Sequence, residues 1–471
     1  MLFQIGRVIL ILLEVLILFN LLIVVHELGH FLAARWRGLY IERFGVWFGK
    51  PIWKKTVNGV QYSLGSLPFG GFVALPQLAP MDIIEGKADV DRAELPPVSA
   101  IDKIIVAVAG PLFSVLLAFA IASLIWVVGY PVSEADMTTT VGYILPESPA
   151  LKAGLQPGDR ILSVDGKAVK RFLGMNDSVS WAVVRSEGDT IPITFERNGA
   201  VQTVQVEPYR AETKGWRRKS IRQLLIYPAE TPIIGEVEPN SPAAAAGFRS
   251  QDIIRSVNGT PIYHPAALLD HITKHPDQEL TLQVERNGQS TEVQVKPALL
   301  PTEGEKKPRI GIKWTDKLTI AHPTPVEQIY NSVTSTVNTI GAVASPKSDV
   351  GIQHLSGPLG IFRIYYVLFQ NEHGWQLALW FSVILNVNLA IINMLPIPVL
   401  DGGHIVLGII ESVRRKPLNT RLLEMVQGVC TVLIIGVIIY ITFFDVQDLP
   451  FVQKLEKYHS KTNQKGDPGA P

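Results

Sequence analysis

Four apolar blocks, each about as long as a bilayer-spanning helix, constrain the fold of this chain more than any other feature. They cover residues 8–34, 104–129, 377–400 and 425–444. The hydrophobic fraction of 47% is ordinary, but the mean hydropathy of +0.23 is high for a soluble protein, so apolar residues are gathered in these blocks beside a soluble part. We therefore predict a membrane protein with an α-helical bundle of four transmembrane helices. A cleaved signal peptide is the alternative for the first block, but that run is too long and no small-residue cleavage site closes it.

The placement of lysine and arginine predicts the side of the membrane on which each loop lies, because cytoplasmic loops carry an excess of basic residues. Two loops are rich in them, one after the first block and one between the third and fourth. Their basic residues are Arg35, Arg37, Arg43, Lys50, Lys54 and Lys55, and then Arg414, Arg415, Lys416 and Arg421. Both loops share one side in a four-span topology, so we expect them in the cytoplasm, with residues 130–375 and both termini outside.

Bulk composition excludes some classes of protein. The net charge of +1 gives no electrostatic case for binding nucleic acid. The single cysteine, Cys430, excludes an intramolecular disulfide framework. The four apolar blocks make the lipid bilayer the expected partner.

The external segment contains an internal repeat. Residues 148–166 (SPALKAGLQPGDRILSVDG) recur as residues 241–259 (SPAAAAGFRSQDIIRSVNG), and ITFERNGAVQTVQVEP is echoed by LQVERNGQSTEVQVKP. Both copies alternate as strands do, close hairpins on Asn-Gly, and leave room for a helix such as PAALLDHITKH. We predict two tandem α+β domains, residues 135–228 and 229–300, which resemble PDZ domains of the bacterial, circularly permuted kind. The resemblance implies peptide capture by strand addition to an open edge; two rigid spacers without a ligand are the alternative.

The first apolar block carries the stretch HELGH, whose titratable groups are costly in hydrocarbon and therefore indicate function. His26 and His30 are four residues apart, so a helix places both imidazoles on one face within reach of a single ion. Glu27 lies on a neighbouring part of the helix surface, where it can reach water beside that ion without being a ligand. A catalytic zinc site needs three protein ligands and an open position. The alternative is a pair of bundle-facing histidines bonded to backbone carbonyls.

A third ligand is sought in NMLPIPVLDGGH, residues 393–404, at the end of the third block. Pro396 and Pro398 cannot continue a helix, and open backbone at membrane depth is tolerated only around a buried or wet site. Asp401 follows this break, and a divalent cation would offset the cost of burying its carboxylate. His404 is the rival ligand. Asp401 can also serve as the N-cap of the helix that follows.

Together, HELGH, the AGP of the second block, the PDZ-like external segment and NMLPIPVLDGGH resemble the site-2 protease family over nearly the whole chain. The tandem PDZ domains and four spans are similar to its RseP-type bacterial subgroup, the sigma-E protease regulators of envelope stress. One departure is Ser114, where the family often has Asn three residues after the Pro of GP. This difference puts one polar contact near the site in doubt, though not the metal.

The resemblance implies an intramembrane zinc metalloprotease, with Zn2+ held by His26, His30 and Asp401 and with Glu27 as the general base. It implies that Asn393 hydrogen-bonds the substrate backbone. Its substrates are single-span membrane proteins cleaved within their transmembrane segments, such as an anti-sigma factor already trimmed outside or a leftover signal peptide. The resemblance places the chain in the bacterial inner membrane, with the PDZ domains and both termini in the periplasm.

The stretch VQYSLGSLPFGGFVAL alternates and then reaches Gly70 and Gly71. From the residues alone it is strand-like, lies on the cytoplasmic side and is too apolar for a free loop. It resembles the re-entrant β-loop that pairs with an unwound substrate. With Pro396 and Pro398, these glycines complete the candidate substrate-binding residues.

Two other functions remain open on the residues alone. A non-enzymatic PDZ scaffold with a structural metal does not need the carboxylate of Glu27 beside its ligands. A metal transporter would be expected to carry more intramembrane carboxylates than Glu14 and Asp401. The protease is therefore the preferred hypothesis.

The expected organisation is as follows. Transmembrane or membrane-associated segments are residues 1–36, 101–130, 320–345 (a juxtamembrane amphipathic helix), 375–412 and 422–445. The cytoplasm-side β-loop region is 37–100, whose linker 76–100 matches no pattern that we can place. A C-terminal tail covers 446–471.

Overall fold

The computed structural model describes residues 2–78, 95–213, 215–300, 307–415 and 420–449. Most of the linker and nearly all of the C-terminal tail predicted from the sequence lie outside these residues. The chain divides into two compact units. The first holds Met1–Tyr130, His322–Val337 and Ile352–Pro471, and the second holds Pro131–Ala321 and Asn338–Gly351.

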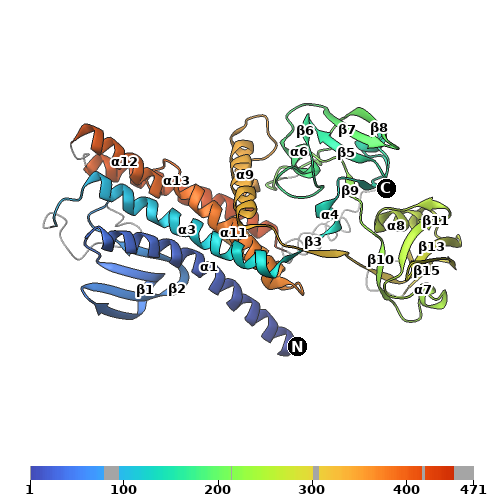
Figure 1. Ribbon diagram of the computed structural model, residues 1–471, viewed down its shortest axis with the longest axis horizontal. Helices are drawn as coiled ribbons and strands as arrows, with labels where there is room; N and C mark the ends of the chain where they lie inside the picture. Colours follow the sequence, from blue (N-terminus) through green and yellow to red (C-terminus); the bar gives the residue numbers. More distant parts are fainter. Residues whose placement is uncertain (1, 79–94, 214, 301–306, 416–419, 450–471) are drawn as a thin grey trace, which may run out of the picture. The chain divides into compact units, whose positions relative to one another are not determined.

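Within the described residues, four helices are long and apolar enough to cross a membrane, in agreement with the four predicted spans. They are α1 (Leu2–Trp36), α3 (Ala100–Val128), α11 (Gly374–Asn393) and α13 (Thr420–Gln447). Helices α1 and α11 pack against α3 (Figure 1). Only 17% of the apolar window of α13 is buried within the protein, so most of its surface needs lipid around it.

The ends of these helices follow from local chemistry. Ser99 caps α3 by accepting a hydrogen bond from the backbone N–H of Asp102, and Gly129 ends it with a φ of 72°. After α11, Pro396 and Pro398 prevent helical continuation, and α12 (Asp401–Arg414) begins a new helix. Arg415 ends α12 in the left-handed region.

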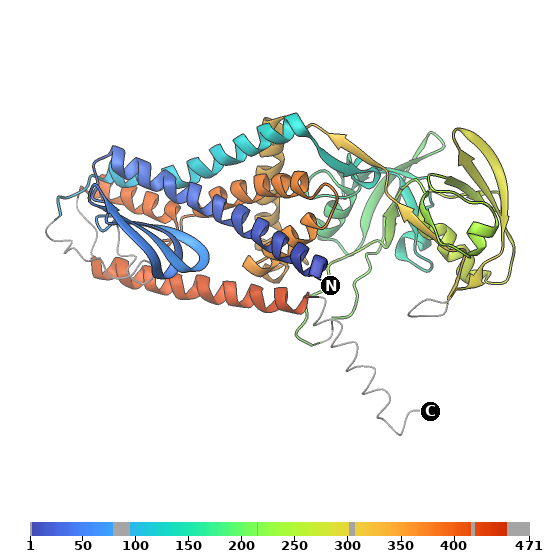
Figure 2. The same cartoon turned by 90° about the horizontal axis from the view of Figure 1, so that it is seen from below.

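Strands β1 (Arg43–Val57) and β2 (Val60–Ala74) form a hairpin next to α1 (Figure 2). The chain turns at Asn58-Gly59, where both φ angles are positive, as a two-residue hairpin turn requires. β2 then curves back, so that Gly71–Ala74 pair with one side of Arg43–Val46 and Gln61–Leu64 pair with the other. Gly71–Ala74 therefore form an edge of the sheet.

The second unit contains two copies of one arrangement, in the chain order strand, short helix, strand, short strand, helix and hairpin, with a final strand paired to the first. The first copy is β4 (Val141–Ile144), α5 (Pro149–Lys152), β5 (Arg160–Val164), β6 (Lys167–Ala168), α6 (Val179–Arg185), β7 (Ile191–Arg197), β8 (Ala200–Val206) and β9 (Ile226–Pro228). The second is β10 (Ile233–Val237), α7 (Pro242–Ala245), β11 (Ile253–Val257), β12 (Thr260–Pro261), α8 (Pro265–Lys274), β13 (Leu280–Arg286), β14 (Gln289–Val295) and β17 (Ile312–Thr315).

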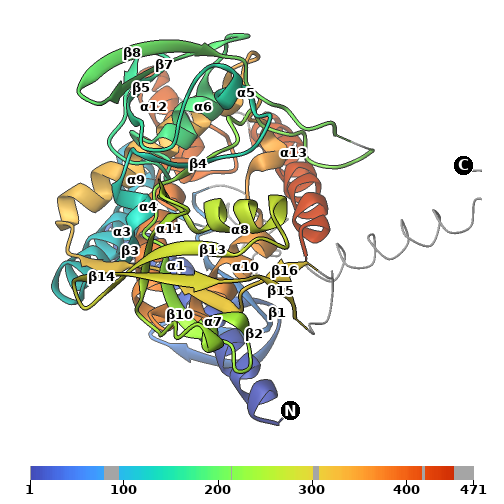
Figure 3. The ribbon, with the colours of Figure 1, turned by 90° about the vertical axis from the view of Figure 1, so that its right-hand side faces the viewer.

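Each copy has its own apolar core. In the first, Val179 and Val183 of α6 pack with Ile193 of β7. In the second, Leu268 and Ile272 of α8 pack over β13 (Figure 3). The predicted hairpins, the turns at Asp165-Gly166 and Asn258-Gly259, and the helix PAALLDHITK all have their counterparts here.

The second copy extends past the predicted boundary at residue 300, because β17 pairs with β10. This strand was not predicted from the sequence, because it is separated from the preceding hairpin and lacks a repeat signature of its own. The predicted amphipathic helix is α9 (Pro325–Ala344), which starts later than expected because Leu318–Ala321 form β18, paired with β3 (Tyr130–Ser133). A further helix, α10 (Pro358–Phe369), was not predicted.

Candidate metal centre

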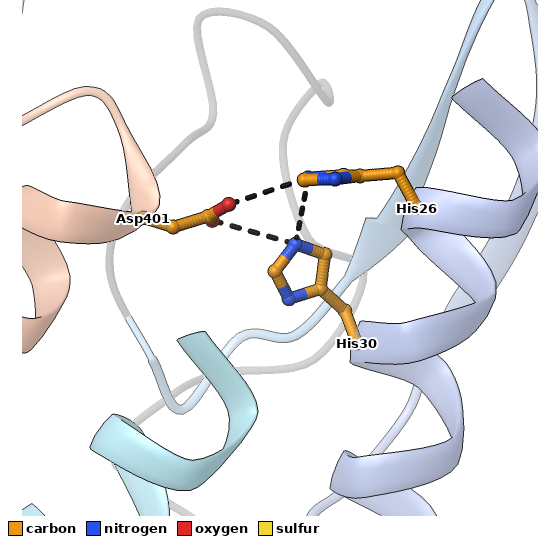
Figure 4. Close-up of side chains that lie close together, drawn as sticks. All are labelled: His26, His30 and Asp401. Carbon is orange, nitrogen blue, oxygen red and sulfur yellow. Dashed lines mark hydrogen bonds and ion pairs between the residues drawn. The ribbon is translucent and has the colours of Figure 1, made fainter. Parts of the chain in front are cut away.

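The three predicted ligands lie together within the first unit. α1 carries His26 and His30 one turn apart, and α12 begins at Asp401 opposite them (Figure 4). His26 Nε2 lies 3.2 Å from Asp401 Oδ2, and His30 Nε2 lies 3.4 Å from Asp401 Oδ1. The two Nε2 atoms are 3.2 Å apart. The ligand atoms of this group all lie within 4.8 Å of one another.

Small residues allow the helices to approach this closely. A Cβ on Gly29 of α1 would meet the carbonyl oxygen of Ala109 in α3 at 2.4 Å. A Cβ on Gly110 would meet His30 Nε2 at 2.2 Å and His26 Nε2 at 2.8 Å. Gly110 therefore leaves the space in which both imidazoles meet Asp401.

α3 also orients both rings through their other nitrogens. His30 Nδ1 lies 2.8 Å from the carbonyl oxygen of Val106. A carbonyl only accepts, so Nδ1 carries the proton, and in the neutral ring Nε2 has a free lone pair. His26 Nδ1 lies 2.9 Å from Ser114 Oγ, a hydroxyl that can accept in the same way. Such outer contacts are typical of histidines that bind metals.

Asp401 is not the N-cap of α12. That position belongs to Leu400, and no side chain caps the helix, so the N-cap alternative is wrong. The carboxylate points instead toward the imidazoles, and Asp401 Oδ2 is buried without a hydrogen-bond partner. A buried unpaired carboxylate oxygen is costly.

These observations fit a divalent cation. Two imidazole lone pairs and a carboxylate converge, and without a cation they repel one another. Two ligands of a tetrahedral zinc at about 2.0–2.1 Å lie about 3.3 Å apart, close to the 3.2 Å between the two Nε2 atoms. Nitrogen and oxygen donors are those that zinc accepts in catalytic sites.

A cavity of about 290 Å³ opens over the three side chains, and it is lined by Glu27, Asn393, Gly71 and His404 among others. The Glu27 carboxylate lies beside the backbone N–H of Val73 on the edge of β2. Gly71 sits against the Glu27 side chain, because a Cβ there would lie 3.4 Å from Glu27 Cγ. Asn393 Nδ2 lies 3.3 Å from His26 Nε2.

Other candidates lie further away. Gly70 is not among the residues lining this cavity; a Cβ on it would overlap the ring of Phe48, and its φ is 83°. Pro396 and Pro398 shape the turn between α11 and α12 without lining the cavity. The rival ligand His404 lines the cavity. Among the described residues, however, it does not belong to the group of side chains whose ligand atoms converge.

Some residues of the site were not predicted from the sequence. Gly110 could have been found from the AGP stretch, which demands a close approach. Ser114, noted only as a departure, contacts His26 and is fully buried. Lys103 donates to Glu411 at 2.8 Å, and this pair lines the cavity where α3 meets α12. No sequence signal links two residues so far apart.

Comparison with known proteins decides the family. A model of peptidase family M50 matches residues 14–437. The chain belongs to peptidase family M50. It is therefore a zinc metalloprotease of the site-2 protease type, which confirms the predicted family and enzyme class.

Curated relatives match over most of their length. The chain is 28% identical to a putative zinc metalloprotease of Neisseria meningitidis over 424 residues, 85% of this chain and 91% of that protein. It is 27% identical to the regulator of sigma-E protease RseP of Escherichia coli, covering 88% of this chain and 94% of that protein. A PDZ domain from Listeria innocua matches 18% of this chain and 93% of its own length, with 19% identity and a TM-score of 0.17.

Proposed function

We propose that His26, His30 and Asp401 hold one zinc ion and that Glu27 is the general base of an intramembrane peptidase. The observation that supports this proposal is the convergence of three metal-ligand atoms beside a cavity that Glu27 lines. One of them, Asp401 Oδ2, is buried without a hydrogen bond. Beside α1, a helix of membrane-spanning character, such an arrangement is costly unless an ion binds.

Zinc bound there would supply a Lewis acid that polarises the scissile carbonyl and makes water more acidic. The chain's own residues do the rest. Glu27 takes a proton from the attacking water and returns it to the leaving amine, as a general base and then a general acid. The backbone N–H of Val73 lies beside the Glu27 carboxylate and helps to orient it. Ser114 and Val106 hold the imidazoles in place.

The substrate must unwind, because a transmembrane helix hides its carbonyls in its own hydrogen bonds. Gly71–Ala74 form a sheet edge whose Val73 N–H already faces Glu27. We infer that the unwound segment adds to this edge and that Asn393 donates to its backbone. The hairpin then acts as the re-entrant β-loop, with Gly71 leaving room for the substrate chain beside Glu27.

The two copies in the second unit act, in this proposal, as tandem PDZ domains outside the membrane. Among the described residues, β9 pairs only with β4 and β17 only with β10, so each copy has an open edge to which a peptide can add. They gate the site by admitting substrates whose external part has been trimmed. Deleting residues 135–315, which removes both copies through β17, is expected to release cleavage of an untrimmed single-span substrate, and unchanged selectivity would refute the gate.

The basic residues support a topology with the hairpin side of the membrane in the cytoplasm and with the two copies and both termini in the periplasm. Relatives named regulators of sigma-E protease support single-span substrates of the envelope stress response, such as a trimmed anti-sigma factor, as well as leftover signal peptides. The membrane is then the bacterial inner membrane.

The test compares wild type with Glu27→Gln on a model single-span substrate in detergent, with metal content measured in both. The amide keeps the shape of the side chain but cannot take the proton, so cleavage should fall by about 10²–10⁴-fold while the metal stays. Glu14→Gln is the matched control, because Glu14 lies on the same helix and is not among the residues lining the cavity. Equal cleavage by wild type and Glu27→Gln would remove the assignment.

A further inference from the structure

A buried arginine in the second unit has no part in the chemistry described above. Arg222 is 2% exposed and is the largest of the fully buried side chains among the described residues. Arginine is almost never fully buried unless it is paired. Arg222 lies four residues before β9, in the lead into the open edge of the first copy.

Its partner is a carboxylate from a distant part of the chain. Arg222 Nε lies 2.9 Å and Nη2 3.3 Å from the two oxygens of Asp349. Arg210 Nε donates to the same Oδ2 at 2.9 Å. Arg222 Nη1 donates to the carbonyl of Gly188, just after α6, at 3.1 Å. Two cations thus hold one carboxylate where the lead into β9 meets the end of α6.

The segment that carries Asp349 is seated at more than one point. Arg185, the last residue of α6, donates to Asn338 at 2.9 Å, and Ser345 donates to Glu187 at 2.7 Å. Residues 338–349 therefore follow the end of α6 to the two arginines. Burial alone would raise the pKa of Asp349, but the hydrogen bonds from Arg222 and Arg210 lower it below its usual value. The carboxylate is therefore charged at neutral pH.

The second copy lacks this site. Ile226 lies opposite Ile144 in the first copy, and Ile312 lies opposite Val237 in the second. Ile144 and Val237 are equivalent in the repeat, so counting back four residues from each final strand gives Arg222 in one copy and Pro308 in the other. Leu225 and Gly311, one residue before the strands, both have positive φ, which supports this alignment.

We propose that Arg222 and Arg210 form a carboxylate-binding site of the first copy and that Asp349 is its internal ligand. While Asp349 is seated, the first copy is closed to a peptide carboxylate, and the second copy, without the arginine, is not closed in this way. Competition by an external peptide rests on the proposed peptide-binding role. The binding of Asp349 by the two arginines does not depend on that role.

The physical reason is the cost of the buried guanidinium. Removing one partner from a buried ion pair leaves an uncompensated charge and is strongly destabilising. Arg222 therefore needs an anion at all times, and Asp349 can leave only in exchange for another carboxylate. An internal ligand at millimolar effective concentration weakens the apparent affinity of any competitor.

The test measures binding of fluorescein-labelled peptides to the full-length protein in detergent by anisotropy. The first probe is the sequence of residues 344–351, Ala-Ser-Pro-Lys-Ser-Asp-Val-Gly, with a C-terminal amide. The second has Asn in place of its Asp. The third is the Asn peptide with a free C-terminal carboxylate. The proteins are wild type, Asp349→Asn, Asp349→Asn with Arg222→Met, and Asp277→Asn as the matched surface control.

Asp349→Asn should bind the first probe more than about tenfold more tightly than wild type or Asp277→Asn, because the internal competitor is gone. The Asn amide probe should not bind, and adding Arg222→Met should abolish binding. Binding of the third probe by Asp349→Asn would extend the site to a terminal carboxylate, and its absence would restrict the site to the aspartate side chain. Equal affinity of wild type and Asp349→Asn, or equal binding of the Asp and Asn amide probes, would overturn the proposal.

If Asp349→Asn does not fold, Ser345→Ala decides, because it removes the exposed contact with Glu187 that helps to seat the internal segment and leaves both arginines in place. A severalfold gain in binding of the first probe over wild type is then expected, and no gain would overturn the proposal. No step of this test requires cleavage, so failure of the proposed peptidase mechanism leaves its outcome unchanged.

Discussion

Carboxylates with buried oxygen atoms occur in both units of this protein, and their hydrogen bonding is opposite. In the second unit, Asp252 accepts two hydrogen bonds from Arg286, both at 2.7 Å, and one from the backbone N–H of Arg249 at 2.8 Å. Asp159 has the same set in the first copy, from Arg197 and Gln156. In the first unit, Asp401 faces two imidazole lone pairs, and one of its oxygens has no hydrogen-bond partner.

This difference in hydrogen bonding distinguishes an aspartate that stabilises the fold from one that serves the chemistry of a site. A carboxylate with all its acceptors filled ties a loop to a hairpin and specifies the fold. A carboxylate left unfilled, on a helix that begins beside two histidines, is stable only with a cation. The unfilled group is therefore the better indicator of function, although each carboxylate has a buried oxygen.

The largest effect is expected from Gly110→Ala. Its Cβ would lie 2.2 Å from His30 Nε2 and 2.8 Å from His26 Nε2, so the imidazoles cannot converge on Asp401. We expect both metal content and cleavage to fall below about 1% of wild type, since a catalytic site needs all three ligands. Metal analysis and a cleavage assay check this. Gly428→Ala is the control, because a Cβ there meets nothing within 4 Å. Normal metal content in Gly110→Ala would contradict the geometry.

For the fully hydrogen-bonded carboxylates of the second unit, we predict that removing the arginine partner lowers stability and leaves the metal bound. Arg286→Met leaves Asp252 buried and unpaired, which should destabilise the second copy by about 3–5 kcal/mol. Arg255→Met, which removes an exposed partner of Glu285, should cost no more than about 1 kcal/mol. Urea unfolding followed by limited proteolysis of the second unit measures both. If Arg286→Met also emptied the metal centre, the two kinds of carboxylate would not be independent.

Ser114→Ala tests the outer contact of His26. Loss of such a partner lowers metal affinity by about 10–100-fold, and competition with a chelator measures it. Ser123→Ala, another serine of α3 whose hydroxyl bonds only to its own helix at Phe119, should leave affinity unchanged. Ser114→Thr keeps the hydroxyl and should recover part of the loss. Equal affinity in wild type and Ser114→Ala would show that the contact does not orient the ring.

The smallest effect concerns pH. Burial alone would raise the pKa of Asp252, but hydrogen bonds from Arg286 and the backbone of Arg249 lower it overall. A lowered folded-state pKa means that this stability is fully present above the unfolded pKa of about 3.9 and is lost as pH falls through the folded pKa. The unfolding free energy of the second unit should therefore drop below about pH 4. In Arg286→Met this drop should shrink, and an unchanged pH profile would exclude the pair as its cause.

The cluster of His26, His30 and Asp401 could be predicted from the sequence because each part of it has a local signature. The spacing of His26 and His30 follows from helix geometry, and the double proline before Asp401 marks a break. The repeat likewise predicted the hairpins and α8. What the sequence could not show were contacts between distant segments with no periodic pattern, namely Ser114 to His26, Lys103 to Glu411, and β17 to β10. The N-cap alternative for Asp401 was wrong because the carboxylate turns toward the imidazoles instead of the helix end.

Zinc content together with zinc X-ray absorption on the purified protein decides whether His26, His30 and Asp401 share one zinc ion. We expect about one zinc per chain, with imidazole nitrogen and carboxylate oxygen at about 2.0–2.2 Å and no sulfur. We also expect zinc to be retained in Glu27→Gln and lost in Asp401→Asn. Full zinc content with unchanged coordination in Asp401→Asn, or a sulfur ligand from Cys430, would contradict this assignment.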